Sequence, residues 1–243
     1  MQTTIFDSDK IIFLDTETTD ASEDARLVQL AYKEPQSGSI VDELFKPPVP
    51  ISFHAMAVCH ITNDMVADKE FFSESIEHSK LATMLTDHTL IAHNAPFDIR
   101  VLRNEGVETM RSIDTLRIAR HMIESESYKL QYLRYSLDLG VEGRAHDAFG
   151  DILVLEALYY YLVDLLKVKH ALSNDFEVVK KMVELSNTPV LLTTIQFGKY
   201  VGKTFEEIAR LDHSYLDWLY SSESLKSEHE QNEDLLYTLA EYC

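Results

Sequence analysis

Cysteine, basic residues and long apolar runs are all scarce in this chain of 243 residues. Two cysteines, Cys59 and Cys243, are too few for a disulfide framework or a zinc cluster, so a reducing cytoplasm is the expected compartment. No apolar run reaches the roughly 20 residues that a membrane helix needs. The first ten residues, MQTTIFDSDK, lack the basic start and the apolar stretch of a signal peptide. We therefore expect a cytoplasmic protein that does not associate with a membrane.

The 22 basic residues are outnumbered by 41 acidic ones, which gives a net charge of −19. This balance argues against a passive nucleic-acid coat protein, because such proteins usually carry a basic surface. It does not exclude an enzyme that recruits cations, since bound Mg²⁺ can be the largest local charge in a site. Any affinity for duplex nucleic acid is expected to be weak and sensitive to salt.

Apolar runs and turn residues along the chain predict an α/β fold. Three strands joined by short links, followed by alternating strands and helices, predict a mixed sheet flanked by helices. The predicted strands are 11–17, 26–34, 39–47 and 89–94, the segment 111–122 combines a short strand with the start of a helix, and the predicted helices are 73–86, 96–106, 129–139 and 148–168.

The chain is expected to divide between residues 170 and 190. We assign 1–170 to the main domain, 171–188 to a linker or a helix, and 189–243 to a small C-terminal region. In that region GKYVGKT (198–204) resembles a phosphate-binding loop, but three residues separate its glycines where the motif needs four. Its lysines beside aromatic residues suit phosphate and base binding. A small packed appendage with its own aromatic core is the favoured interpretation.

Four acids lie near the ends of predicted elements. Asp15 and Glu17 share one face of their strand, because side chains alternate with period two, and they lie at its C-terminal end, where ligands of α/β sheets tend to bind. Asp98 falls in the first turn of the helix after strand 89–94, and Asp151 falls in the first turn of the longest helix. Each acid by itself could be an ordinary surface or capping residue.

These four carboxylates, if they meet, would repel and raise one another's pKa. Two divalent cations would remove that conflict, and a cation pair can hold both the attacking and the leaving oxygen of a phosphoryl displacement. Mg²⁺ prefers such oxygen ligands. His146 lies in the predicted loop before the helix of Asp151, and the near-neutral pKa of imidazole suits a general base.

Three stretches around these residues resemble known motifs. FLDTET (13–18), AHNAPFD (92–98) and AHDAFGD (145–151) are similar, in order and spacing, to the three motifs of the DEDDh exonuclease superfamily. Residues 50–71 and 197–219 are similar to the bacterial exonuclease X family within it, so the resemblance covers most of the chain.

The resemblance implies a ribonuclease-H-like fold with a mixed five-stranded sheet and a small C-terminal appendage. It also implies a DNA-repair or end-processing enzyme that releases nucleoside 5′-monophosphates stepwise, 3′→5′, from single-stranded or frayed DNA 3′ ends. Its cofactors would be two Mg²⁺ ions, which Mn²⁺ can replace. By motif position, the metal ligands are Asp15, Glu17, Asp98 and Asp151, and the general base is His146.

Contacts with the terminal nucleotide are implied at further positions. Cys59 stands where relatives typically carry a histidine near that nucleotide, and His60 could substitute for it. Phe97 could pack against sugar or base, or belong to the core. Asp20 replaces a usual glycine, but aspartate tolerates a left-handed backbone comparatively well. The expected substrate-binding residues are Thr16, Thr18, Cys59, His60, Asn94 and Phe97, of which Asn94 is also a candidate helix cap.

Two alternatives remain open. The substrate could be RNA, although small oligoribonucleases of the superfamily usually carry a DLEMTG-like first motif. The chain could also be a binding module without catalysis, although all five expected catalytic residues are present. No feature of the sequence identifies a protein partner.

Overall fold

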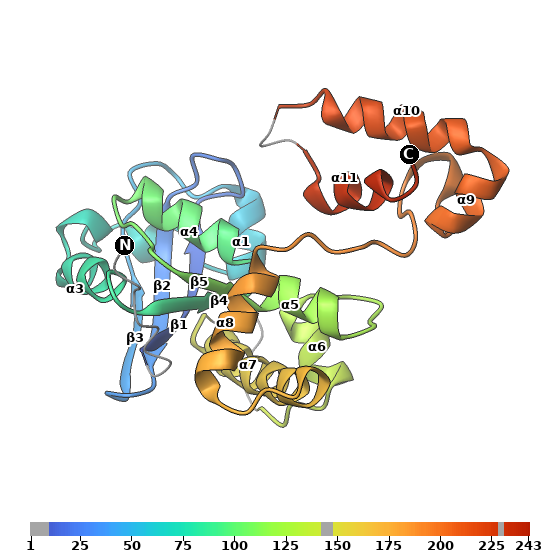
Figure 1. Ribbon diagram of the computed structural model, residues 1–243. Coiled ribbons are helices and arrows are strands. Elements are labelled where there is room, and N and C mark those ends of the chain that lie inside the picture. Colours follow the sequence, from blue (N-terminus) through green and yellow to red (C-terminus); the bar gives the residue numbers. More distant parts are fainter. Residues whose placement is uncertain (1–9, 142–147, 228–230) are drawn as a thin grey trace, which may run out of the picture. The chain divides into compact units, whose positions relative to one another are not determined.

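The computed structural model describes residues 10–141, 148–227 and 231–243, which fall into two compact units that divide between Ser186 and Asn187 (Figure 1). The first unit contains β1 (Ile11–Thr18), β2 (Leu27–Glu34), β3 (Ser39–Leu44), α1 (Phe53–Cys59), α2 (Asn63–Val66), the 3₁₀ turn η1 (Phe72–Glu74), α3 (Ile76–Met84), β4 (Thr89–Ala92), α4 (Ala95–Asn104), β5 (Ser112–Asp114), α5 (Thr115–Met122), α6 (Leu130–Ser136), α7 (Ala148–His170) and α8 (Asp175–Ser186). The second contains η2 (Gly198–Tyr200), α9 (Phe205–Leu211), α10 (His213–Ser224) and α11 (Glu233–Ala240).

The five strands form one mixed sheet in the order β3-β2-β1-β4-β5, which confirms the predicted fold class. β1 pairs antiparallel with β2, and β2 pairs antiparallel with β3 through a turn in which Gly38 has a φ of 71°. β1 and β4 are parallel, as are β4 and β5. Because β1 and β4 run the same way, their C-terminal ends lie at the same edge of the sheet.

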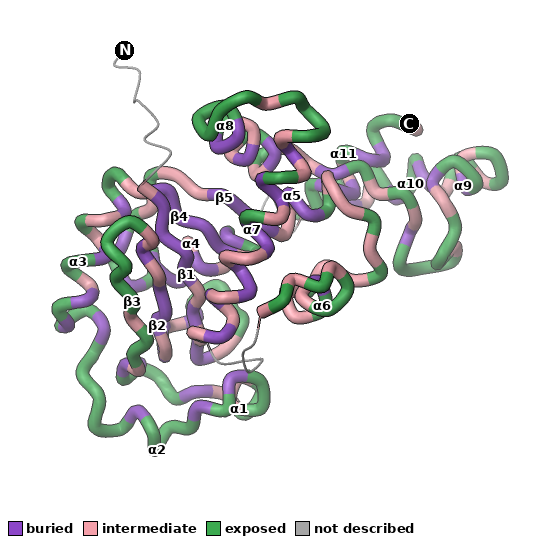
Figure 2. The backbone as a smooth tube through the Cα atoms, turned by 90° about the horizontal axis from the view of Figure 1, so that it is seen from below, coloured by how far each residue is buried: buried purple, intermediate pink, exposed green. Residues whose placement is uncertain are grey.

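Both faces of the sheet are buried along the central strands, which are purple in Figure 2, whereas the edge strand β3 is mostly exposed. Ile11 and Phe13 of β1 pack with α5, α6, α7 and α8, whereas Ile12 and Leu14 pack with α3 and α4. This alternation follows from the period of two along a strand. It also assigns Asp15 and Glu17 to the face of β1 that α7 covers, because they continue the series of Ile11 and Phe13.

Four predicted elements are clearly shorter in the structure, namely 39–47, 73–86, 89–94 and 129–139, and two of them have a local cause. The predicted helix 73–86 is divided into η1 and α3, because Ser75 caps α3 by accepting a hydrogen bond from the His78 amide at 3.1 Å. The predicted strand 89–94 ends at Ala92, since Asn94 adopts a left-handed backbone with a φ of 78°. Asn94 is the N-cap residue of α4, although its side chain makes no capping hydrogen bond.

Helix α8 occupies the range that was expected to hold a linker or a helix. Its buried residues Val178 and Met182 belong to the same core cluster as α7. The first compact unit therefore extends to Ser186.

The C-terminal unit has a core of its own, formed by Ile195, Phe205, Ile208, Leu216, Leu219, Leu235 and Leu239. A single antiparallel bridge joins Thr194 and Thr204. Thr204 ends the sequence that resembles a phosphate-binding loop, and its side chain instead caps α9 in a capping box with Glu207. Tyr200 packs against this core and donates a hydrogen bond to Asp212 at 2.8 Å. These contacts give the loop a structural role within the unit.

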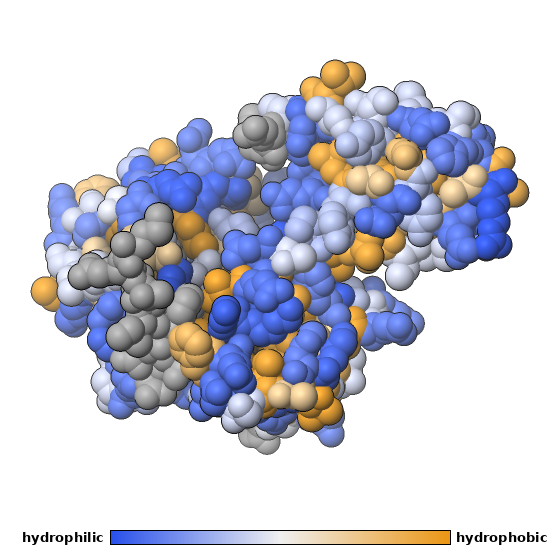
Figure 3. Space-filling model, in the orientation of Figure 1, coloured by the Kyte–Doolittle hydropathy of each residue, from blue (hydrophilic) through white to orange (hydrophobic). Residues whose placement is uncertain are grey.

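Hydrophilic residues cover most of the visible face of each unit in Figure 3. Within the described ranges, no helix combines the length and the apolar character that crossing a membrane would require.

Candidate active site

Asp15 and Glu17 lie toward the C-terminal end of β1. Asp15 is paired with Ala31 of β2 in the sheet register, and Glu17 is paired with Gln29. The register shifts directly after Glu17, at Thr18, where the strand ends. Both carboxylates are half-buried, in a strand whose other residues are almost entirely covered. The strand therefore presents two acids at the edge of the sheet where β4 also ends.

Asp98 reaches the same edge from the opposite face of the sheet. It lies in the first turn of α4, which begins three residues after the end of β4, and its side chain is only 4% exposed. Thr16 of β1 donates a hydrogen bond from its hydroxyl to Asp98 Oδ1 at 2.7 Å. This hydrogen bond links the first turn of α4 to β1 at the residue between Asp15 and Glu17.

Asp151 is supplied by the first turn of α7, the helix that packs on the other face of β1. Gln131 of α6 donates a side-chain amide hydrogen bond to Asp151 Oδ1. The charge of Asp151 acts on both Asp15 and Glu17. The structure thus brings together all four acids that the sequence singled out, from β1, α4 and α7.

The pKa values of this cluster are displaced upward. Burial is the main cause of the raised pKa of Asp15, and the charges of Asp98, Glu17 and Asp151 add to it. Burial, followed by the charges of Asp151 and Asp98, raises the pKa of Glu17 to about 7. Burial also raises the pKa of Asp98, against the opposing effect of the Thr16 hydrogen bond. The cluster is therefore costly to keep fully ionised at neutral pH unless positive charge is added.

The side chains fit a divalent cation by their chemistry. Four carboxylates supply the hard oxygen atoms that Mg²⁺ prefers, and positive charge relieves their shared repulsion. Among the residues whose positions the structure gives, no three His, Cys, Asp or Glu side chains already form a group that could hold an ion. Two of the acids are instead engaged by neutral donors, Asp98 by Thr16 and Asp151 by Gln131.

The expected nucleotide-contacting threonines use their hydroxyls within the protein. Thr16 donates to Asp98, as described, and Thr18 donates to the backbone oxygen of Asp20 at 2.6 Å. Asp20 itself accepts a hydrogen bond from the Ser22 amide at 2.7 Å, which organises the turn after β1. Phe97 is half-buried against the core of the α4 face, and the Arg100 guanidinium lies 5.3 Å from its ring centroid.

Cys59 and His60 lie at the end of α1 and differ in exposure. Cys59 is buried with Val28, Ile51, Ile61 and Val66. Burial raises the pKa of its thiol, and the charge of Glu17 contributes to the same shift, so this cysteine lies beside the acidic cluster. His60 is exposed and has a left-handed backbone, with a φ of 60°. Only His60 of this pair therefore presents its side chain to solvent.

His146, the expected general base, lies outside the described residues. Asn94 is exposed, and its backbone amide donates to Asp114 Oδ1 at 2.9 Å.

Gln131 and Asp114 belong to the site but were not singled out from the sequence. Asp114 ends β5, caps α5, and adds to the raised pKa of Asp98 through its charge. An acid at the end of a parallel strand was the same signal that drew attention to Asp15, so Asp114 could have been found. No comparable signal marks Gln131, because its contact with Asp151 depends on how α6 packs on α7.

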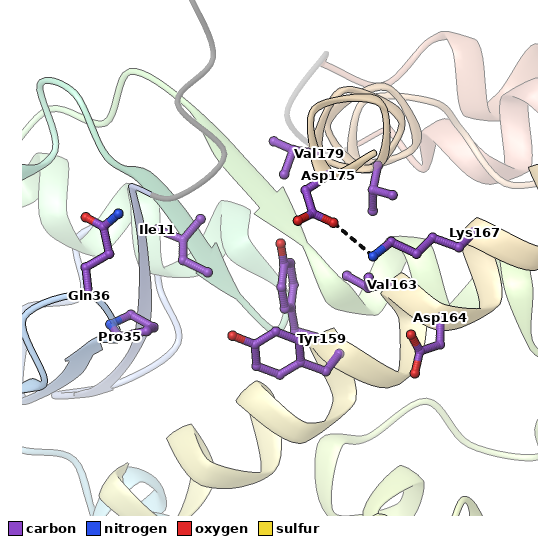
Figure 4. Close-up of a pocket in the computed structure, with 11 residues that line it drawn as sticks. Ile11, Pro35, Gln36, Tyr159, Val163, Asp164, Lys167, Asp175 and Val179 are labelled. Atoms are coloured by element: carbon purple, nitrogen blue, oxygen red, sulfur yellow. Dashed lines mark hydrogen bonds and ion pairs between the residues drawn. The ribbon is translucent and has the colours of Figure 1, made fainter. Parts of the chain in front are cut away.

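A separate hollow lies at the other end of β1, and Figure 4 shows its lining. Ile11 borders it at the start of the strand, roughly 20 Å from Glu17 at 3.3 Å per residue. Tyr159, Val163 and Val179 supply apolar surface, and Lys167 pairs with Asp175 at 2.9 Å. This hollow is therefore distinct from the acidic cluster.

Comparisons with known proteins agree with this arrangement. A family model described as exonuclease matches residues 12–159, and one described as exodeoxyribonuclease X-like C-terminal matches residues 195–223. Exodeoxyribonuclease 10 of Escherichia coli K12 is 32% identical over 216 residues, which cover 86% of this chain and 90% of the relative. The DNA polymerase III subunit epsilon of Rickettsia prowazekii is 29% identical over 219 residues, which cover 82% of this chain and 92% of that protein.

A solved structure described as exonuclease X in complex with 5′ overhanging duplex DNA superposes with a TM-score of 0.56 at 28% identity. The match covers 73% of this chain and 99% of that chain. The family match, the mixed five-stranded sheet and the acids gathered at one edge of it agree. The chain belongs to the exonuclease family, has a ribonuclease-H-like fold, and carries a C-terminal segment of the exodeoxyribonuclease X-like type.

Proposed function

We propose that this chain is a metal-dependent 3′→5′ exodeoxyribonuclease that hydrolyses the terminal phosphodiester and releases nucleoside 5′-monophosphates. Its substrates would be DNA 3′ ends, single-stranded or frayed, in repair or end processing. The relative named exodeoxyribonuclease 10 and the solved complex with overhanging duplex DNA support DNA as the substrate.

One observation carries the proposal: at a single edge of the sheet, burial and neighbouring acids raise the pKa values of Asp15, Glu17 and Asp98, and Asp151 contributes to the shifts of Asp15 and Glu17. Buried carboxylates with raised pKa values destabilise the folded protein at neutral pH. The presence of several of them at one place therefore favours a functional role over a structural one. Asp15, Glu17, Asp98 and Asp151 would hold two Mg²⁺ ions, or Mn²⁺ in their place. When bound, such ions activate water and stabilise charge on the leaving oxygen of a phosphodiester.

The chain's own residues would divide the remaining tasks. His146, from the segment before α7, would accept the proton of the attacking water, as an imidazole can near neutral pH. Thr16 fixes the carboxylate of Asp98, and Gln131 fixes that of Asp151. Asn94, Phe97 and His60 lie on the segments that flank the acids, and they would contact the terminal nucleotide.

The direct test uses matched DNA and RNA strands of one sequence, labelled separately at the 5′ and 3′ ends. With Mg²⁺, the purified protein should release nucleoside 5′-monophosphates from the 3′ end of DNA, and EDTA should stop the reaction. Release that starts from the 5′ end would refute the direction. Faster release from RNA than from DNA would refute the substrate, and cutting within the strand would refute exonucleolytic action.

His146→Ala should lower kcat by about 100-fold or more, which is typical for loss of a general base. Wild-type kcat should rise with pH through the range in which imidazole loses its proton, near 6.5, and this limb of the profile should disappear in the variant. A variant with an unchanged pH profile would show that another group accepts the proton.

A further inference from the structure

The segment of residues 115–137, which spans α5 and α6, differs in charge from most of the chain. It holds four Lys or Arg residues and two acids, within a chain in which acids outnumber these bases by 41 to 22. The four cations are Arg117, Arg120, Lys129 and Arg134. Lys169 of α7 lies beside them, because its ammonium donates to the His121 backbone oxygen at 3.4 Å. This basic segment therefore forms a local cationic surface on an acidic unit.

Hydrogen bonds connect the basic segment to the turn before α4 and to Asp151 of the acidic cluster. His93, in the turn between β4 and α4, is hydrogen-bonded through Nε2 to the Tyr128 backbone oxygen at 2.7 Å. Gln131 donates to Asp151 through its side-chain nitrogen, and its oxygen accepts a hydrogen bond from Arg134 Nη1 at 3.3 Å. The guanidinium of Arg134 thus lies one side chain away from Asp151. The basic segment therefore lies next to the acidic cluster on the side of Asp151.

Aromatic rings accompany these cations. The Arg134 guanidinium lies 5.1 Å from the ring centroid of Tyr135, and Arg120 lies 6.0 Å from that of Tyr128. Tyr135 is 73% exposed, and Tyr132 is 38% exposed. Exposed rings interleaved with cations are the surface that single-stranded nucleic acids use, since phosphates pair with the cations and bases stack on the rings.

A second segment next to the acidic cluster differs from the basic segment in charge. The loop after β1 carries three acids, Asp20, Glu23 and Asp24, and one cation, Arg26. Arg26 is paired with Glu105 at 2.8 Å, and the nearby Arg100 is paired with Glu23 at 3.1 Å. Phosphates of a strand that leaves the cluster are repelled by this loop and attracted by the basic segment.

We propose that the basic segment binds the substrate strand upstream of its 3′-terminal nucleotide, with Arg120 and Lys129 on phosphates and Tyr135 stacked on a base. This rests on the proposed function only for where the strand ends, because binding itself needs no turnover. The surface accounts for how a protein of net charge −19 holds a polyanion. It recognises backbone and base faces, so it is indifferent to sequence.

The test measures binding of fluorescein-labelled dT12 by anisotropy in EDTA, where no hydrolysis occurs. The double substitution Arg120→Ala with Lys129→Ala should weaken binding about 10-fold. It should also flatten the dependence of log K on log salt by about 1.4, or 0.7 per lost phosphate contact. Arg103→Ala is the matched control, because Arg103 is an exposed cation on α4, 63% accessible and outside the segment. Equal affinities for the double variant and the Arg103→Ala control would overturn the proposal.

Tyr135→Ala should weaken binding about 5- to 10-fold, and Tyr135→Phe should restore it, because stacking needs the ring and not the hydroxyl. Failure of Tyr135→Phe to restore binding would overturn the stacking contact.

In Mg²⁺, the loss in kcat/KM of each alanine variant should be larger on dT12 than on a dinucleotide, which is too short to reach along the basic segment. Equal losses on both would overturn the assignment. Wild-type protein that binds dT12 but releases no mononucleotide would instead count against the proposed function alone.

Discussion

The acidic cluster of the first unit and Asp212 of the C-terminal unit differ in how the protein shifts the pKa of a carboxylate. In the first unit, burial and neighbouring acids raise the pKa values of Asp15, Glu17 and Asp98. In the C-terminal unit, hydrogen bonds from Lys199, Tyr200 and Ser214 lower the pKa of Asp212. The same chemical group therefore opposes folding in one unit and supports it in the other. Acids that lower the stability of the folded protein are typical of catalytic and binding sites.

The largest expected effect separates the two kinds of acid by activity. Asp15→Asn should reduce Mg²⁺-dependent release of mononucleotides by about 1,000-fold or more, because a metal ion supplies several kcal/mol of transition-state stabilisation. Asp212→Asn should leave turnover near the wild-type level. Chromatography of the released nucleotides from a labelled strand gives both rates. Comparable losses of activity in the two variants would show that the two acids do not differ in function.

Removing a charge from the acidic cluster should increase stability, although the same kind of change reduces activity. Glu17→Gln should raise the free energy of unfolding in EDTA by up to about 3 kcal/mol at pH 8, since each pKa unit corresponds to about 1.4 kcal/mol. The folded-state pKa of Glu17, about 7, lies above its usual value of 4.5, so the cost of ionisation appears as the pH rises through this interval. The gain should therefore vanish below about pH 4.5.

Thermal or urea unfolding at several pH values measures this gain, and Mg²⁺ provides its control. Added Mg²⁺ should stabilise the wild-type protein, because a ligand that binds only the folded state shifts the equilibrium. It should stabilise Glu17→Gln less. A variant that is less stable than the wild type in EDTA at pH 8 would show that Glu17 supports the fold.

The smallest effect concerns Asp212. Its pKa is held below the usual 3.8, so its contribution to stability is present above that pH and is lost as the pH falls further. Asp212→Asn should lower the Tm by only about 1 °C at pH 7, since exposed ion pairs contribute little. The difference should shrink in high salt and as the pH falls below 3.8. Calorimetry measures the shift, and a loss of several degrees at pH 7 would show that Asp212 contributes more than an ordinary exposed ion pair.

The sequence was sufficient for the features that depend on local patterns. The alternation in IIFLDTET placed Asp15 and Glu17 on one face, and the apolar run from Ile152 predicted the long helix α7. Asp98 was located because a helix follows directly on a buried strand. In each case the pattern lies within one element or across one connection.

The features that sequence could not supply depend on packing between distant elements. Gln131 and Asp151 are 20 positions apart, and only the contact of α6 with α7 brings them together. Cys59 of α1 is buried with Val28 of β2 and Ile51, a contact between distant elements that the sequence does not specify. Helix α8 belongs to the first core for the same reason, since nothing in its sequence specifies which surface it covers.

The alternation along β1 has a consequence for how such a chain can vary. Asp15 and Glu17 point to one side of the sheet, while Thr16, between them, reaches Asp98 from the other. A deletion or insertion of one amino acid inside β1 would exchange these roles, turning hydroxyls toward α7 and carboxylates toward α4. The loop after Thr18 can change length without that penalty. Among related proteins, insertions and deletions should therefore be found in the loop after Thr18 and should be absent from β1.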